Sequence, residues 1–261
     1  MIYTMRPRPS LLIFLSIFLA KLVIAQSISN TDSRSSNNSN EFNFSFFAGG
    51  SVLGSKADIE SNMSTSGLGQ TSPAGWFGDA KAHPFTRSYP IADIEATYYF
   101  TKRMGISLNS GIKNNIEVLG YQDIGIGNFM ILKNEIWSVS LNYSYRFKNT
   151  KNCLFIGPSY FIHSVKEDNG SQNPPQNKNT KFGANIGYSH QILQKKHWFM
   201  ALRANYCWAP KSEIGPFVAE HQLGIATPDP KTYTSVFNPT KVSITCLNFG
   251  LCIGLRTTAE N

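Results

Sequence analysis

The sequence has little charge and little cysteine, and beyond its first 25 residues it has no long apolar run. Charged residues make up 15% of the 261 residues and aromatic residues 13%. The formal net charge is +8, but no basic run alternates with aromatic residues as nucleic-acid binding would require. The four cysteines are widely spaced, and the His and Cys residues lack the close pairings of a zinc site. We therefore predict no nucleic-acid partner, no metal and no cofactor.

The N-terminus has the order of a secretory signal peptide. Arg6 and Arg8 precede the apolar run Leu11–Ala20, and small residues follow before Gln26. A lysine directly after the run cuts it to about half of the roughly 20 residues that a membrane-spanning helix needs. We expect residues 1–25 to be a cleaved signal peptide that sends the chain out of the cytoplasm.

The rest of the chain divides by composition into three parts. Residues 26–40 are rich in Ser and Asn and are predicted to form a disordered lead. Residues 41–256 contain eight alternating segments separated by turn-rich gaps, and residues 257–261 form a short tail. The eight segments are Glu41–Leu53, Tyr89–Phe100, Gly105–Lys113, Ile136–Phe147, Leu154–Ser164, Lys181–Ile192, Trp198–Trp208 and Ser243–Arg256.

The stretch WSVSLNYSYRF shows the alternation most clearly. One row of alternate residues is apolar or aromatic and the other is polar, which is the period-two pattern of a β-strand. The apolar row is Trp137, Val139, Leu141, Tyr143, Tyr145 and Phe147, and the other row, polar after its first residue, is Ile136, Ser138, Ser140, Asn142, Ser144 and Arg146.

Short and long gaps alternate between the segments. The short gaps are Thr101–Met104, Lys148–Asn152 and Leu193–His197, and the long gaps are Gly54–Ser88, Asn114–Asn134, Val165–Thr180 and Ala209–Val242. The ends of the third and fifth strands are open, and Ile116–Leu119 could extend the third strand beyond the membrane. An even number of strands of about ten residues, with short turns on one side and long loops on the other, is the layout of outer-membrane barrels.

A soluble β-sandwich or a lipocalin-like barrel would show the same alternation. However, a soluble core would not be built from Ser138, Asn142 and Arg146, and aromatic residues gather at both strand ends, as they do at membrane interfaces. We predict an all-β protein of the outer membrane, an eight-stranded antiparallel transmembrane up-and-down β-barrel. Its turns are expected to be periplasmic and its long loops extracellular.

Three stretches carry a resemblance to a known family. YYFTKRMGISLNSGI (Tyr98–Ile112), WSVSLNYSYRF (Trp137–Phe147) and LNFGLCIGLR (Leu247–Arg256) make the chain resemble the small eight-stranded outer-membrane barrels of OmpA/OmpX-like architecture. Its sequence pattern most resembles that of the barrel-domain proteins of Bacteroidetes. The resemblance implies the fold rather than an activity. Such barrels often end on an aromatic residue read by the assembly machinery, whereas this chain continues as TTAEN.

Several charged residues are predicted to point into the barrel. Eight strands leave an interior just wide enough to be filled by side chains, so these charges should pair in a luminal network. The alternative is a gated ion path or a small polar ligand site that favours anions. The predicted luminal charges are Asp93, Glu95, Lys113, Arg146, Lys181, Arg203 and Arg256.

Two cysteines fall together on the predicted inner face. Cys207 and Cys246 lie near the long-loop ends of neighbouring strands, and a disulfide between them is permitted outside the cytoplasm. The alternative is a pair of small buried thiols.

Catalysis would need a nucleophile and a base on one face. His163 and Ser164, like Ser189 and His190, are adjacent in sequence, so a strand points the members of each pair to opposite faces. The other histidines, including His221, fall in predicted loops or a turn. We therefore predict no catalytic residues and no enzyme, with a lipid-modifying activity as the remaining alternative.

The partners expected from sequence are lipid and surface ligands. Outer-membrane lipid should cover the barrel, loops 54–88 and 209–242 could bind an external ligand, and residues 75–85 are the most aromatic loop segment. We expect a monomer with a structural or surface-interaction role, or alternatively a narrow channel or transport-associated barrel. Basic turn residues could contact periplasmic cell-wall polymer or lipid headgroups, namely Lys102, Arg103, Lys148, Lys151, Lys195 and Lys196.

Overall fold

The computed structural model describes residues 41–52, 55–66, 68, 85–122, 128–148, 151–168, 176–223 and 231–258. All of these residues lie in the second of two compact units, which begins at Ser39. The predicted signal peptide, the predicted lead, residues 75–84 and the last three residues of the tail lie outside the described residues.

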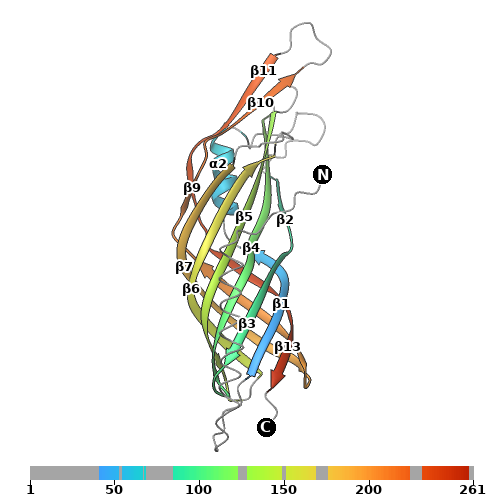
Figure 1. Cartoon of the computed structure of the whole chain (residues 1–261). Coiled ribbons are helices and arrows are strands. Elements are labelled where there is room, and N and C mark those ends of the chain that lie inside the picture. Colours follow the sequence, from blue (N-terminus) through green and yellow to red (C-terminus); the bar gives the residue numbers. More distant parts are fainter. Residues whose placement is uncertain are drawn as a thin grey trace, which may run out of the picture. The chain divides into compact units, whose positions relative to one another are not determined.

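A ring of eight antiparallel strands forms the body of this unit (Figure 1). Each strand pairs with its neighbour along the chain, and the first strand of the ring pairs with the last. The predicted closed ring of eight antiparallel strands is therefore confirmed. The strands are β1 (Glu41–Val52), β3 (Ile91–Tyr99), β4 (Met104–Gln122), β5 (Asn128–Arg146), β6 (Asn152–Glu167), β7 (Gln176–Gln194), β8 (Trp198–Trp208) and β13 (Cys246–Thr258).

The two ends of the ring differ. The short turns between β3 and β4, β5 and β6, and β7 and β8 lie together with the start of β1 and the end of β13, at the bottom of Figure 1. We call this the turn end. β13 continues through Thr258, two residues past the predicted barrel boundary at Arg256.

The seam between β1 and β13 brings two glycines together. Gly49 is the pairing partner of Gly250. A Cβ atom added to Gly250 would lie 2.2 Å from the backbone oxygen of Ala48, and one added to Gly49 would lie 2.0 Å from that of Phe249. A side chain at either position would therefore require the facing strand to shift.

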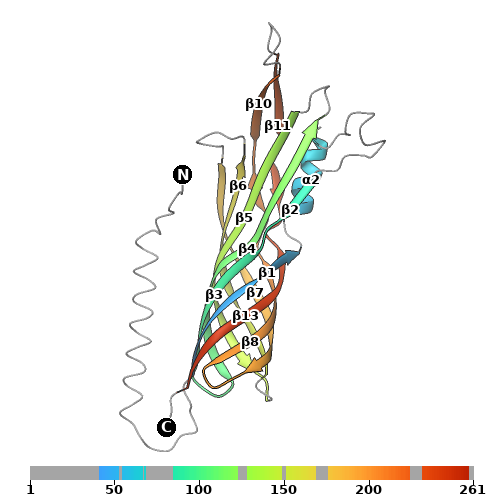
Figure 2. The same ribbon diagram turned by 90° about the vertical axis from the view of Figure 1, so that its right-hand side faces the viewer.

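The predicted loops 54–88 and 209–242 contain regular elements. The first holds helix α2 (Lys56–Thr65) and β2 (Phe85–Ser88), which pairs with β4. The second holds β9 (Ser212–Ile214), β10 (Phe217–Leu223), β11 (Lys231–Phe237) and β12 (Thr240–Val242), in which β9 pairs with β12 and β10 with β11. Figure 2 shows the β10–β11 hairpin extending past the far end of the ring.

The predicted strand length of about ten residues is wrong for half of the ring. Strands β4, β5 and β7 have 19 residues each and β6 has 16, so much of the predicted gaps Asn114–Asn134 and Val165–Thr180 is strand. A register shift between Ile112 and Asn114 keeps Ile116 and Val118 on the inner side of the longer β4.

The inner face of β5 changes chemistry along the strand. Ser138, Asn142 and Arg146 are buried inside the ring near the turn end, whereas Leu132 and Ile136 are buried on the same row further along. The outer row changes in the opposite sense, from exposed Leu141 to exposed Lys133. We call the part beside Trp137–Arg146 the barrel section and the part beside Asn128–Ile136 the upper section.

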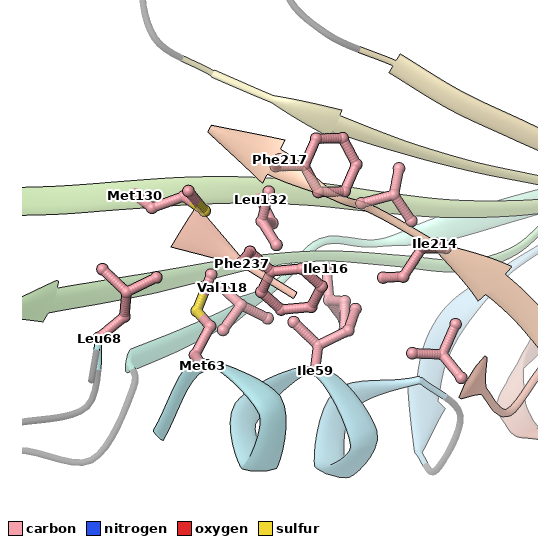
Figure 3. Packing of buried hydrophobic residues seen from close by; sticks show 12 residues of the cluster. Ile59, Met63, Leu68, Ile116, Val118, Met130, Leu132, Ile214, Phe217 and Phe237 are labelled. Atoms are coloured by element: carbon pink, nitrogen blue, oxygen red, sulfur yellow. The ribbon is translucent and has the colours of Figure 1, made fainter. Parts of the chain in front are cut away.

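The upper section encloses an apolar core (Figure 3). Ile59 and Met63 of α2 meet Val118 and Leu132 of the long strands, with Phe237 of the hairpin beside them. This burial explains why the strands continue past the barrel section. The complete set, which we call the upper core, is Ile59, Met63, Leu68, Ile116, Val118, Met130, Leu132, Val165, Ile214, Phe217, Phe237 and Val242.

Polar contacts hold α2 over this core. The Asp58 carboxylate accepts the Ser243 backbone N–H at 2.6 Å and lies 3.5 Å from the Lys211 ammonium. The Asn62 side chain donates to the Asn238 backbone oxygen at 2.7 Å. No helix among the described residues is long and apolar enough to cross a membrane.

Candidate functional site

Two ion clusters fill the lumen of the barrel section. The first lies at the turn end, where the Arg146 guanidinium donates to both carboxylate oxygens of Glu41, at 2.8 and 2.5 Å. Arg256 lies 2.8 Å from the same carboxylate, and the Tyr99 ring lies 3.5 Å beneath the Arg146 guanidinium. One carboxylate thus compensates two buried or partly buried arginines.

The second cluster joins Asp93, Glu95, Lys113 and Arg203. Lys113 donates to Asp93 at 2.5 Å, and Arg203 donates to Glu95 at 2.7 Å. Arg203 also lies 3.9 Å from Asp93, which links the two pairs. Two carboxylates and two cations balance each other, as buried charges require. The Phe155 ring, centred 4.3 Å from the Arg203 guanidinium, covers its face.

Six of the seven predicted luminal charges belong to these two clusters. Lys181 does not, since it pairs in register with Phe161 further from the turn end and makes no ion pair with the described residues. Sequence reasoning missed Glu41 and Tyr99. The inward direction of Glu41 could have been predicted from the alternation. Glu41 is the first residue of the strand and lies on the face opposite Phe42.

Amide and hydroxyl groups fill much of the remaining lumen. Asn205 donates to Asn185 at 3.2 Å and Asn185 donates to Asn142 at 3.3 Å, which spans three strands. Ser140 and Ser159 share a hydrogen bond of 2.7 Å. A cavity of about 30 Å³ lies among Glu95, Tyr99, Arg203 and neighbouring groups. This volume suits about one water molecule rather than an organic ligand.

An apolar layer separates this polar lumen from the upper core. Ile136, Phe161 and Ile244 are fully buried in it, together with Cys207, Ala209 and Cys246. The buried amide of Asn114, the pairing partner of Ile136, lies at the same level.

The two cysteines predicted to pair lie directly opposite each other. Cys207 is the pairing partner of Cys246 on adjacent strands, and both are buried. In this structure both are free thiols, and the Cys207 Sγ contacts Asn185 Oδ1 at 3.6 Å. The Cα spacing of directly opposed strand residues, about 4.5 to 5.5 Å, falls within the range of disulfides. The disulfide stays a prediction.

Two titratable groups are buried beyond the apolar layer. His163 Nε2 lies 2.6 Å from Asn134 Oδ1, and burial lowers the pKa of His163 to about 4. Glu167 is fully buried, neither of its carboxylate oxygens has a hydrogen-bond partner, and burial raises the pKa of this carboxyl group.

The serine and histidine residues considered for catalysis do not come together. His163 binds Asn134, whereas His190 Nδ1 lies 2.6 Å from Asn152 Oδ1. No hydrogen bond joins either histidine to a serine within the described ranges. His221 lies in β10 rather than in a loop. The part of the chain that the structure describes contains no group of three or more His, Cys, Asp or Glu residues placed to hold a metal.

The basic turn residues all point into solvent at the turn end. They are Lys102, Arg103, Lys148, Lys151, Lys195 and Lys196, and we call them the basic rim. None of the three turns, Thr101–Met104, Lys148–Asn152 and Leu193–His197, contains an acidic residue.

Comparisons with known proteins gave structural neighbours only. No protein-family model matches the sequence, and no curated relative matches it. The attachment invasion locus protein Ail of Yersinia pestis is 10% identical, with 84% of this chain and 99% of that chain covered and a TM-score of 0.39. The outer membrane protein OprG of Pseudomonas aeruginosa is 11% identical, with 87% and 100% covered and a TM-score of 0.40. At these values the likeness supports no assignment of function.

Proposed function

We propose that this chain is an outer-membrane protein whose closed barrel anchors a folded, water-exposed upper section at the cell surface. The observation that carries the proposal is the change of chemistry along the long strands. The barrel section has its apolar side outside and its polar side inside, and the upper section has the reverse.

The outer surface of the barrel section fits only an apolar surrounding. Large apolar side chains of every ring strand are exposed there, for example Ile156 at 50%, Leu202 at 53% and Leu255 at 63%. A continuous belt of this kind is far larger than the apolar patches of water-soluble proteins. A closed ring is also the one sheet that satisfies its backbone hydrogen bonds inside lipid.

Aromatic residues mark the two edges of this belt. On the side of the upper section they are Trp137, Tyr160, Phe182 and Trp208, and at the turn end they are Phe100, Phe147 and Trp198. Aromatic rings favour membrane interfaces. We take the spanning segments to lie between these two levels, so that His163 and Glu167 lie outside them.

The predicted signal peptide and the short turns support an orientation with the turn end in the periplasm. The upper section then lies outside the cell, where it has its own core and holds up the β10–β11 hairpin. A rigid support for exposed connections is the usual arrangement of a binding surface. We therefore propose a structural or surface-interaction role, with the upper section as the presenting surface.

A narrow channel is not favoured, because ion clusters and the apolar layer fill the lumen. Planar-bilayer recording of the purified protein tests this directly. We expect no stable single-channel steps, and reproducible steps would overturn the proposal of a closed barrel that serves as an anchor.

Fractionation and gel mobility test the membrane assignment: the protein should be in the outer-membrane fraction and should migrate differently after boiling. Recovery in the soluble fraction without a mobility shift would contradict it.

A further inference from the structure

We propose that Cys207 and Cys246 form a disulfide in the exported chain, and that this bond clamps the base of the excursion between β8 and β13. By the excursion we mean residues 209–245, which leave the ring after β8 and return to it at β13. The inference rests on the proposed export of the chain, because the cytoplasm keeps thiols reduced. It adds a covalent bond that the anchor role does not require.

The pair lies where the last two strands of the ring separate. Cys246 is the first residue of β13 and Cys207 is the last but one of β8, and the register of the two strands ends at this pair. Beyond it the excursion forms β9 and β12, whose residues Ile214 and Val242 belong to the upper core. A bond at this point would close the base of the excursion and keep the β8–β13 ladder from opening at its end.

The two sulfur atoms are in position for the bond. Both side chains are fully buried on the inner face, and the two thiols are hydrogen-bonding neighbours. Directly opposed residues of antiparallel strands have a Cα spacing inside the range of disulfides. The disulfide can therefore form while β8 and β13 keep their register.

The amide groups around the pair suit sulfur atoms that accept hydrogen bonds and donate none. Asn205 Nδ2 donates to Cys207 Sγ at 3.5 Å, and Asn248 Nδ2 donates to Cys246 Sγ at 3.9 Å. Oxidation removes the Cys207 thiol as a donor to Asn185 Oδ1, but this oxygen also accepts from Asn205 at 3.2 Å. Each of these polar groups thus keeps a partner in the oxidised form.

The other two cysteines lie elsewhere in the lumen. Cys252 is six residues further along β13, which is about 20 Å at the usual rise of a strand. Cys153 is the second residue of β6, and both line the small cavity beside Arg203. All four cysteines are among the described residues, so the chain contains no other thiol that could compete for the pair.

The oxidant is a second disulfide, of a thiol oxidoreductase during export or of glutathione in vitro. One cysteine thiolate attacks a sulfur of that disulfide, which gives a mixed disulfide and releases the oxidant's other sulfur as a thiol. The second cysteine thiolate then attacks the protein sulfur of the mixed disulfide and releases the oxidant's remaining thiol. Two protein thiols are oxidised, and one disulfide is reduced to two thiols. Since both cysteines are fully buried in the ring, the exchange takes place before β8 and β13 pack.

Mass spectrometry of the full chain from outer membranes tests the bond. The chain is denatured in N-ethylmaleimide without reductant. We expect Cys153 and Cys252 to be alkylated, and Cys207 and Cys246 to appear in one cross-linked pair of peptides. Four alkylated cysteines, or a cross-link that involves Cys153 or Cys252, would overturn the proposal. Fractionation reports the membrane placement separately.

Folding in lipid vesicles tests the order of events without regard to localisation. The variant Cys153→Ser/Cys252→Ser keeps only the pair, and it should become cross-linked when it folds in a buffer of glutathione and glutathione disulfide. If the oxidant is added after folding, the cross-link should form at least about tenfold more slowly, because the rate depends on access to the thiols. Equal rates would overturn the proposed order.

Hydrogen exchange of the β9 and β12 amides tests the clamp. The oxidised and reduced forms of Cys153→Ser/Cys252→Ser are compared, so that no side chain of the pair is changed. Exchange should be about tenfold slower in the oxidised form, because the bond restricts opening of the excursion. The matched control Cys207→Ser/Cys246→Ser should not respond to the oxidant. Equal exchange in the two forms would overturn the clamp.

Discussion

Arg146 holds Glu41 by two hydrogen bonds across 105 residues of sequence, and so connects β5 to β1 through the interior of the ring. The two strands are not neighbours, since β3 and β4 lie between them on one side. The pair is a cross-brace of the lumen at the turn end. Because Arg256 shares the same carboxylate, β13 is included in the brace.

Loss of this carboxylate should destabilise the barrel strongly. In Glu41→Ala the buried Arg146 and the partly buried Arg256 lose their counter-charge, and removal of one partner from a buried pair costs about 3–5 kcal/mol. We expect a correspondingly lower free energy of unfolding in urea, measured in lipid vesicles. Lys148→Ala, at the exposed rim nearby, is the control and should change it by less than about 1 kcal/mol. A similar effect of the two substitutions would contradict the brace.

An arginine on the outer face should be tolerated in the upper section but not in the belt. Ile186 and Thr180 lie on the same outward row of β7, one inside the belt and one beyond Phe182. Ile186→Arg should cost about 2–4 kcal/mol and Thr180→Arg about 0–1 kcal/mol, because the cost of a charge depends on its depth in the membrane. Unfolding in vesicles measures both values. Equal costs would argue against the proposed edge of the belt.

His163 should make the protein less stable in acid. Its pKa in the folded state, about 4, is below the ordinary value of 6.5, so the unfolded chain binds a proton first as the pH falls. The stability that depends on the neutral imidazole is present above about pH 6.5 and is lost down to about pH 4, by about 3 kcal/mol. In His163→Gln the free energy of unfolding should depend less on pH between these two values. An unchanged slope in His163→Gln would contradict the assignment of this pH dependence to His163.

Glu167 should give the stability a pH dependence opposite to that from His163. Burial raises the pKa of its carboxyl group, so the folded state keeps the proton to a higher pH than the unfolded chain does. Stability is lost as the pH rises through the interval between the unfolded and the folded pKa. Glu167→Gln should therefore stabilise the upper section at neutral pH, measured as slower hydrogen exchange of the β6 amides. Faster exchange would show that the ionised carboxylate has a favourable role.

The outline of the barrel could be predicted because one strand carries enough information. In WSVSLNYSYRF the two rows differ so clearly that both the direction of Arg146 and the exposure of Leu141 follow from period two. The partner of Arg146 could not be predicted, since it depends on the stagger of the whole ring, which no single strand contains.

Most of the upper section, beyond the extension of the third strand over Ile116–Leu119, was missed for a different reason. Leu132 and Ile136 occupy the same row as Ser138, so the row turns from apolar to polar within one strand and the pattern looks like a strand end. Helix α2 gives an equally weak signal, since Ile59 and Met63 are its two buried residues. Its helical state depends on the core that it covers, and that core is assembled from distant segments.

The seam between β1 and β13 determines when the molecule can be completed. Twelve residues of β1 pair with β13, the last strand of the ring to leave the ribosome. Until β13 is available, β1 and β8 each present a row of unpaired backbone groups, which readily joins other chains. The ring therefore closes only after synthesis of all eight strands.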